Sequence, residues 1–193
     1  MQANRVNEQQ HQVRSQSMDE SELRVQLEQF HPVSYGWALS CCAHNPMEAE
    51  DILQTAYLKV LDGRARFDGR AAFKTWLFAV IRHTAADERR RGWLRWARLD
   101  GYRQERDDEV QPAARGDALE QTERGQLFRE KLAKLPRRQQ EVLHLVFYQD
   151  LTIEAAAGVM GISIGSARTH YERGKQRLGE WLQQSEDFNE SRR

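Results

Sequence analysis

The chain has few of the residues that build disulfide-stabilised or membrane-spanning proteins. Its 193 residues include two cysteines and four prolines. Because Cys41 and Cys42 are adjacent, they cannot form an ordinary structural disulfide, and the sequence predicts a protein of the reducing cytoplasm. No apolar run approaches the ~20 residues of a membrane span and no signal-peptide pattern is present, so we expect neither membrane insertion nor export.

Catalytic and metal-binding patterns are missing as well. Cys41, Cys42 and His44 are clustered, but without a distant fourth ligand they make a poor zinc site, and small buried side chains at a helix end are the simpler interpretation. The sequence contains no phosphate loop, no cluster of metal-binding carboxylates and no nucleophile–base pair. We therefore expect no enzyme, no cofactor and no bound metal.

Net charge is also absent, because 29 basic side chains balance 29 acidic ones. Proteins that bind DNA unaided usually carry a basic excess, so the balance argues mildly against that class. The charges are nevertheless segregated: residues 82–98 contain six arginines and two acids, and residues 100–123 contain eight acids and three arginines. Such blocks indicate separate roles for separate segments, and the acidic block, interrupted by Pro112 and Gly116, is typical of a flexible linker.

Apolar residues recur at helical spacing on both sides of this linker, and the sequence predicts an all-α fold of two small helical domains. A first helix is expected near Ser21, with Pro32 interrupting its pattern. The second helix has a clear start, with Asn45 as N-cap and Pro46 at the first helical position, and Gly63 marks its end. Its buried stripe is expected to run from Ala49 through Tyr57 to Leu61.

The first turns of this second helix are acidic. Glu50 and Asp51, followed one turn later by Gln54, form one edge of the helix. Compensation of the helix macrodipole explains the acids without any ligand, whereas a functional interpretation makes the edge a docking site for a basic partner.

The stretch from Phe67 to Arg91 carries the most information. Asp68 is a candidate cap and Gly92 a candidate end of this third helix. One stripe is apolar and predicted to be buried: Phe73, Trp76, Leu77, Val80 and Ile81. The nearly opposite stripe contains Thr75, Phe78, Arg82 and Arg89. Such a face suits a nucleic-acid backbone and unstacked bases, although a merely solvated amphipathic face would contain similar arginines.

The second domain contains the pattern of a helix-turn-helix. Pro136 begins one helix, Thr152 caps the next, Gly161 suits a left-handed turn, and Ser163 caps the last helix. The second helix of such a pair enters the DNA major groove. On a helical wheel the inward positions are Ile164, Ala167, Tyr171, Leu178 and Leu182, and the outward or flanking ones are Ser166, Arg168, Thr169, His170, Arg173, Lys175, Gln176 and Arg177. Residues 163–178 carry four basic side chains and one acid, which favours DNA binding.

Four segments in this order resemble bacterial extracytoplasmic-function sigma factors of the sigma-70 family. They are EAEDILQTAYLKVL at 48–61, the stretch 67–91, LPRRQQEVLHLVFYQDLTIEAAAGVMGIS, and IGSARTHYERGKQRL. The resemblance covers residues 22–183. It implies two helical domains called region 2 and region 4, no catalysis, binding to core RNA polymerase, and recognition of promoter DNA. An anti-sigma partner is common in that family, although no residue of this chain indicates one.

The resemblance also assigns roles to residues. Glu50, Asp51 and Gln54 would dock on core polymerase. The residues that would recognise and open the −10 element are Trp76, Phe78, Arg82, His83, Asp87, Arg89 and Arg90. Those that would read the −35 element are Ser166, Arg168, Thr169, Arg173 and Lys175. His83 stands where the family usually has asparagine, and Ala155 follows Glu154 where the family commonly has a second acid, so a capping box is missing.

We expect a disordered N-terminal tail over 1–18, with Met18 a candidate start, and region 2 over 19–96. The flexible linker is expected over 97–117, region 4 over 118–184, and a frayed tail over 185–193. Two other function classes are less well supported by the sequence. A conventional helix-turn-helix regulator would bind duplex operators directly and would not need the 76–91 helix. An enzyme acting on nucleic acid has no supporting motif.

Overall fold

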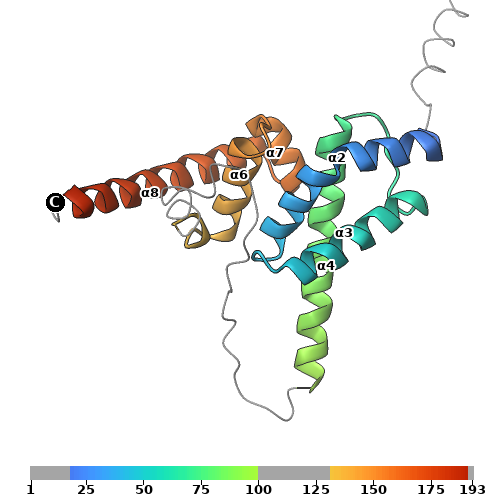
Figure 1. Cartoon of the computed structure of the whole chain (residues 1–193), viewed down its shortest axis with the longest axis horizontal. Helices are drawn as coiled ribbons and strands as arrows, with labels where there is room; N and C mark the ends of the chain where they lie inside the picture. Colours follow the sequence, from blue (N-terminus) through green and yellow to red (C-terminus); the bar gives the residue numbers. More distant parts are fainter. Residues whose placement is uncertain (1–17, 100–130, 191–193) are drawn as a thin grey trace, which may run out of the picture.

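The computed structural model describes residues 18–99 and 131–190, and this part of the chain is all-helical (Figure 1). The expected linker falls on residues 100–130 and most of the expected N-terminal tail on 1–17, so both lie outside the described residues. The helices are α2 (Glu20–Cys41), α3 (Pro46–Leu61), α4 (Phe73–Leu99), α6 (Arg137–Phe147), α7 (Ile153–Met160) and α8 (Ile164–Glu190).

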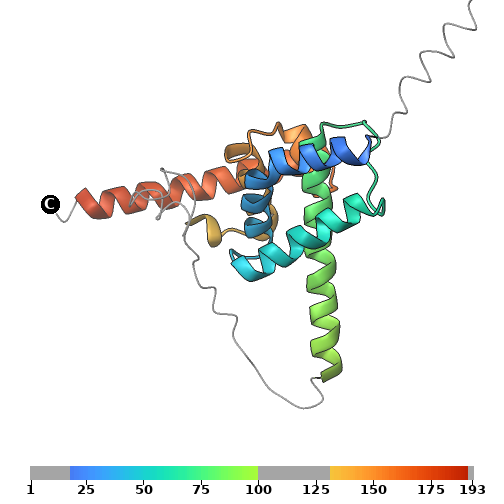
Figure 2. The ribbon, with the colours of Figure 1, turned by 45° about the vertical axis from the view of Figure 1, so that its right-hand side comes forward.

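Helix α2 starts with a complete capping box. The Asp19 side chain accepts from the backbone N–H of Glu22, and the Glu22 carboxylate accepts from the backbone N–H of Asp19. Pro32 lies inside the helix, where it cannot donate the usual hydrogen bond. α2 nevertheless continues to Cys41, and it bends sharply along its course (Figure 2), as expected of an internal proline.

Helix α3 follows its sequence signals closely. The Asn45 side chain accepts from the backbone N–H groups of Met47 and Glu48, Pro46 occupies the first helical position, and the helix ends at Leu61. Gly63 follows with φ 69°, a left-handed conformation that stops the helix.

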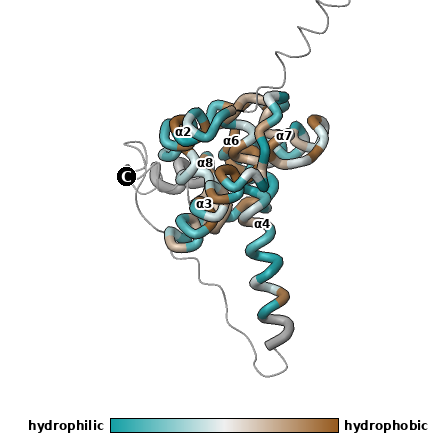
Figure 3. The backbone as a smooth tube through the Cα atoms, turned by 90° about the vertical axis from the view of Figure 1, so that its right-hand side faces the viewer, coloured by the Kyte–Doolittle hydropathy of each residue, from teal (hydrophilic) through white to brown (hydrophobic). Residues whose placement is uncertain are grey.

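Helix α4 is longer than expected at one end and shorter at the other. It begins at Phe73, and Asp68 does not cap it, because the Asp68 carboxylate accepts from the backbone N–H of Arg70 in the preceding loop. Gly92 does not end it, since the helix continues to Leu99. A single glycine without an αL turn costs only ~1 kcal/mol of helix stability. The second half of α4 leaves the bundle as a largely hydrophilic arm (Figure 3).

The C-terminal helices begin where the sequence indicated. Pro136 precedes α6, the hydroxyl of Thr152 caps α7 by accepting from the backbone N–H of Ala155, and α7 ends at Met160 with Gly161 as its C-cap. α8 runs to Glu190, beyond Asp187, so the expected frayed tail is helical up to that residue.

One hydrophobic core joins the N-terminal helices α2–α4 to the C-terminal helices α6–α8. Helix α4 packs on α7 and α2 on α6, and Figures 1 and 2 show the two sets side by side. Leu77 and Ile81 share this core with Val142, Leu145 and Val159, all of them fully buried. A smaller cluster around Leu132, Leu135, Leu143 and Leu178 belongs to the C-terminal helices alone. The sequence predicted two helical domains joined by a flexible acidic linker, and it did not indicate whether the two domains contact each other; in the structure they do.

Candidate nucleic-acid interface

The turn between α7 and α8 fixes the start of the proposed reading helix. Gly161 has φ 63° and ψ 39°, and the backbone N–H of Ile162 donates to the Ala157 carbonyl over 3.1 Å. The Ser163 hydroxyl accepts from the backbone N–H of Ser166, also over 3.1 Å, and so caps α8. The cap and the left-handed turn predicted from sequence are therefore confirmed.

The side of α8 that faces away from the core carries the polar residues expected there. Ala167, Gly174 and Leu178 are buried, whereas the following side chains are exposed and are called the reader face below: Ser166, Arg168, Thr169, Arg173 and Lys175. Ile164 was predicted to point inward, but it is 47% exposed because it precedes the point where α8 meets the core.

Most of the reader face is lightly tethered. The Thr169 hydroxyl donates to the Gly165 carbonyl, Arg168 lies 3.8 Å from the Glu154 carboxylate with both side chains largely exposed, and Lys175 lies over the Tyr171 ring. Arg173 makes no hydrogen bond or ion pair with any other residue of the described ranges. Exposed ion pairs contribute at most ~1 kcal/mol to stability. These basic side chains can therefore exchange their present contacts for contacts with DNA phosphates or base edges.

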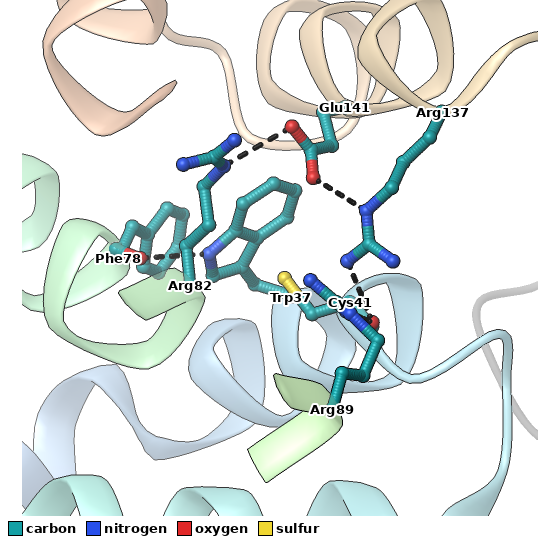
Figure 4. A network of polar contacts seen from close by, with 7 residues as sticks. All are labelled: Trp37, Cys41, Phe78, Arg82, Arg89, Arg137 and Glu141. Carbon is teal, nitrogen blue, oxygen red and sulfur yellow. Dashed lines mark hydrogen bonds and ion pairs between the residues drawn. The ribbon is translucent and has the colours of Figure 1, made fainter. Parts of the chain in front are cut away.

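The predicted DNA-binding stripe of α4 is in a different state, because the C-terminal helices cover its middle (Figure 4). The Arg82 side chain donates to the Glu141 carboxylate of α6 over 3.1 Å, and Glu141 is only 3% exposed. The same carboxylate accepts from Arg137 over 3.0 Å. Arg137 and Arg89 both donate to the carbonyl of Cys41, over 3.1 and 2.9 Å. Burial and the neighbouring Arg137 lower the pKa of the Arg89 guanidinium.

Phe78 was predicted to lie on the exposed stripe, but it is completely buried. Its ring stacks on Trp37 with a 5.9 Å centroid separation, and its backbone carbonyl accepts from the Trp37 indole N–H over 3.0 Å. The helical-wheel prediction was wrong here because it assumed that α4 has a single buried side. Helix α2 and the C-terminal helices together bury a second side.

The other predicted −10 residues are spread around α4. Trp76 is partly buried in an aromatic cluster with Phe67 and Phe73. His83 and Arg90 are exposed, and the Asp87 carboxylate lies between Arg90 at 3.2 Å and Lys59 at 3.8 Å.

One contact across the two sets of helices was missed by the sequence reasoning. The Lys74 ammonium donates to the backbone carbonyl of Gln149 over 2.7 Å, and burial lowers the pKa of Lys74. No local sequence pattern links two residues that are 75 positions apart.

Helix α3 presents the acidic edge to solvent. Glu50, Asp51 and Gln54, called the α3 edge below, are all exposed. Met47, Leu58 and Leu61 continue the same stripe at 78%, 55% and 36% exposure. Leu61 was predicted to be buried and is not. Exposed apolar side chains beside acids, in line along one helix, are typical of a surface that a partner covers.

Cys41 and Cys42 are both free and both buried. Burial raises the pKa of both thiols, that of Cys42 to about 11. Cys41 contributes its backbone carbonyl to the arginine network, as described above.

Comparisons with known proteins agree on one family. Residues 27–95 match the model of sigma-70 region 2, and residues 125–178 match that of sigma-70 region 4. The chain is 31% identical over 132 residues to a probable RNA polymerase sigma-C factor of Mycobacterium bovis, covering 67% of this chain and 68% of the relative. It is 28% identical to the RNA polymerase sigma factor YlaC of Bacillus subtilis, over 70% of this chain and 78% of the relative.

This chain belongs to the extracytoplasmic-function sigma factors of the sigma-70 family. Among solved structures it is similar to the sigma factor RpoE in complex with the anti-sigma factor NepR from Bartonella quintana. That match has a TM-score of 0.65 and 25% identity, and covers 83% of this chain and 96% of that one. CnrH in complex with the cytosolic domain of CnrY shares the fold, with a TM-score of 0.56, 19% identity, and coverage of 90% and 94%.

The protein is therefore an alternative sigma factor, which binds core RNA polymerase and directs promoter recognition and transcription initiation. It is a regulatory subunit and not an enzyme. The region 2 match covers most of helices α2–α4, and the region 4 match covers α6, α7 and the first part of α8; the two sets of helices are called region 2 and region 4 below. Within residues 18–99 and 131–190, no helix is both long and apolar enough to cross a bilayer.

Proposed function

We propose that the reader face of α8 recognises the −35 element in the duplex major groove. The single observation that supports this most strongly is that all five predicted readers are exposed on a capped helix that follows a left-handed glycine turn. Arg173 is the base-reading candidate, because a guanidinium can bond a guanine edge with two hydrogen bonds. Ser166, Thr169, Arg168 and Lys175 hold phosphates and set the register.

Region 2 contacts the −10 element through the polar sides of α4. Arg82, Arg89 and Arg90 neutralise phosphates, and His83 and Asp87 contact bases of the opened strand. Trp76 and Phe78 support this helix from within, since one lies in an aromatic cluster and the other stacks on Trp37. The histidine in place of the family's usual asparagine alters base preference at that position.

The α3 edge docks on core polymerase. Its acids face solvent without an ion pair to any other residue of the described ranges, and they lie in line with the exposed Met47 and Leu58. A mixed acidic and apolar stripe fits a basic partner helix that also offers apolar contact. The site of action is the cytoplasm, where polymerase and chromosome meet. An anti-sigma factor is a further candidate partner, because the similar sigma factor RpoE was captured with the anti-sigma factor NepR.

The −35 assignment is tested by run-off transcription with core polymerase and the Arg173→Ala variant. On promoters mapped by sequencing RNA 5′ ends, we expect the substitution to weaken recognition of the wild-type upstream sequence by roughly 1–3 kcal/mol of binding free energy. Substituting the base pair that Arg173 reads should cost the variant much less than it costs the wild-type chain. Equal losses at every upstream sequence would make Arg173 a phosphate contact. Lys175→Ala is the matched control, for which we expect that uniform loss.

A further inference from the structure

A lysine of α3 lies beside the part of α4 that the proposed function assigns to the −10 element. Helix α3 packs on α4 (Figure 2), and the Lys59 ammonium donates to the hydroxyl of Thr84 on α4 over 3.0 Å. The same ammonium lies 3.8 Å from the Asp87 carboxylate, about one turn further along α4. Lys59, Thr84, Asp87 and Arg90 are called the Asp87 cluster below. Lys59 has no role in the contacts with the −10 element proposed above.

The two carboxylate oxygens of Asp87 face two different cations. Oδ2 lies 3.8 Å from the Lys59 ammonium, and Oδ1 accepts from the Arg90 guanidinium over 3.2 Å. Arg90 belongs to the same helix as Asp87, whereas Lys59 comes from α3. Because each cation attracts a different oxygen, the pair fixes the plane of the carboxylate as well as its place on α4.

Lys59 is held more firmly than Arg90. The Lys59 side chain is 21% exposed, and its ammonium is bonded to Thr84, which is 1% exposed. The Lys59 backbone carbonyl also accepts from the backbone N–H of Ala65 over 2.7 Å. The Arg90 side chain is 73% exposed, and an exposed ion pair within one helix contributes little to stability. A DNA phosphate can therefore take Arg90 away from Asp87, while Lys59 stays in place.

We propose that Lys59 is a positioning residue for −10 recognition, which holds Oδ2 of Asp87 so that Oδ1 accepts a hydrogen bond from a base of the opened strand. This inference rests on the proposed function of α4, in which Asp87 contacts a base and Arg90 a phosphate. When Arg90 moves to its phosphate, Oδ1 becomes free for the base. Lys59 then keeps the carboxylate in the same orientation without touching DNA itself.

The chemistry of a carboxylate restricts the base that Asp87 can contact. An ionised carboxylate offers acceptors only, so its partner must donate. Adenine, cytosine and guanine each carry an exocyclic amino group on the Watson–Crick edge, which becomes accessible when the strand opens. Thymine carries a single N–H between two carbonyl oxygens, and these oxygens repel a carboxylate. The Asp87 cluster should therefore favour a base with an amino group and reject thymine.

Compensation of the α3 macrodipole does not account for these contacts. Lys59 lies in the last turn of α3, where a cation is favourable. That effect needs no partner on a second helix, yet the ammonium is bonded to Thr84 and lies beside Asp87. Because the Asp87 side chain is 41% exposed, its ion pair with Lys59 is screened by solvent. Removing the ammonium should therefore leave region 2 folded.

Three variants separate positioning from the other roles of a lysine. Lys59→Met keeps most of the apolar stem and removes the ammonium, whereas Lys59→Arg keeps the charge and the donor. Thr84→Val removes the anchor of the ammonium and keeps the shape of the buried side chain. Arg24→Gln is the matched control for the loss of one positive charge, because Arg24 is exposed on α2 and its ion pair is with Glu20 of the same helix. Circular dichroism should show the same helix content for all four chains.

Discrimination between bases is the readout, because a merely structural role of Lys59 would not change it. Core polymerase carrying each chain is titrated with a fluorescent fork-junction fragment of a mapped promoter, in which the opened strand presents each of the four bases at one position at a time. For the wild-type chain and Arg24→Gln, we expect one position at which a base with an amino group binds at least about fivefold more tightly than thymine. Lys59→Met and, less strongly, Thr84→Val should lower this ratio toward one, and Lys59→Arg should restore most of it.

Asp87→Ala then tests whether Lys59 acts through Asp87. In an Asp87→Ala chain, Lys59→Met should change the ratio no further, whereas two independent contacts would add. A Lys59→Met chain that keeps the wild-type ratio would overturn the proposal. So would equal weakening with all four bases, which would make Lys59 a phosphate contact. If Asp87→Ala itself keeps the wild-type ratio, the base contact in the proposed function fails instead, so the two failures are distinguishable.

Discussion

Gly174 of α8 lies so close to Leu143 of α6 that a Cβ atom at this position would be 2.9 Å from the Leu143 Cδ1 atom and 3.2 Å from the Gln139 Cβ atom. Glycine therefore lets the reading helix rest directly on its neighbour, which places the reader face of α8 on the outside. Gly174 is buried in a helical conformation, so the requirement is for space and not for an unusual backbone angle.

Gly174→Ala should lower the free energy of unfolding of region 4 by about 1–2 kcal/mol. The added methyl group overpacks the contact and lowers the free energy of unfolding by ~1–3 kcal/mol. The higher helix propensity of alanine offsets up to ~1 kcal/mol of this loss. Urea denaturation monitored by circular dichroism measures this. Gly179→Ala is the control, because nothing lies within 4 Å of a Cβ there, and it should leave stability unchanged or raise it. Equal effects of the two substitutions would contradict the packing argument.

Trp37 holds α2 to α4, since its ring is fully buried and its indole N–H bonds the Phe78 carbonyl. Trp37→Phe removes this bond and leaves a gap beside Phe78 and His144, so we expect a loss of about 1–3 kcal/mol in the free energy of unfolding. Trp93→Phe is the matched control, because Trp93 is 62% exposed on the arm of α4 and its replacement should stay within about 0.5 kcal/mol. A Trp37→Phe variant with the same free energy of unfolding as the wild-type chain would show that this contact does not stabilise region 2.

Sequence reasoning was reliable where structure is local. Asn45, Thr152, Gly161 and Ser163 begin or end helices where predicted, since a cap needs only a side chain and the next turn. It was wrong for Phe78, because a single wheel cannot show that α4 is packed on more than one side.

The assembly of the two regions could not be predicted from local patterns either. Arg82 and Glu141 are 59 residues apart, and nothing near either of them in sequence indicates that they pair. Periodicity identified apolar positions in both regions, but it does not say whether these positions form two cores or one.

His144 gives the stability of the folded chain a pH dependence. Burial lowers its pKa to about 3, with a smaller contribution from His44, whereas in the unfolded chain it titrates near its ordinary value of 6.5. Above about pH 6.5 the imidazole is neutral in the folded and the unfolded state and has no effect. As pH falls from there toward 3, only the unfolded state takes up the proton, so stability falls.

The slope of this loss approaches about 1.4 kcal/mol per pH unit once the unfolded-state histidine is largely protonated. Urea midpoints measured at about pH 7.5 and about pH 5 should therefore differ more for the wild-type chain than for His144→Gln. His83→Gln, at an exposed position, should keep the wild-type dependence. Parallel pH profiles for wild type and His144→Gln would contradict a buried neutral imidazole.

Both thiols should be inert in the folded chain. Cys41 is 1% exposed and Cys42 7%, and burial raises both pKa values, so little thiolate is present near neutrality. Ellman's reagent should react with native protein at a small fraction of the rate seen in denaturant, where both of the two cysteines become accessible. Rapid reaction of either thiol in the native chain would be inconsistent with the buried end of α2.

Asp51→Arg should weaken binding to core polymerase at least about tenfold without unfolding region 2, since the side chain is exposed and faces the proposed basic partner. Glu28→Arg reverses a charge on exposed α2 surface of the same region and should leave the affinity unchanged. Fluorescence anisotropy of the labelled chain titrated with core enzyme compares the two. If both reversals weaken binding equally, net charge and not the α3 edge determines docking.

The central claim is that this chain gives core polymerase a promoter preference through two separate DNA-binding surfaces. Its most direct test is to map RNA 5′ ends from genomic DNA transcribed by core polymerase with and without the purified chain. We predict new start sites that share an upstream and a downstream element at constant spacing, and that are lost with Arg173→Ala. Identical start sites with and without the chain would contradict the account.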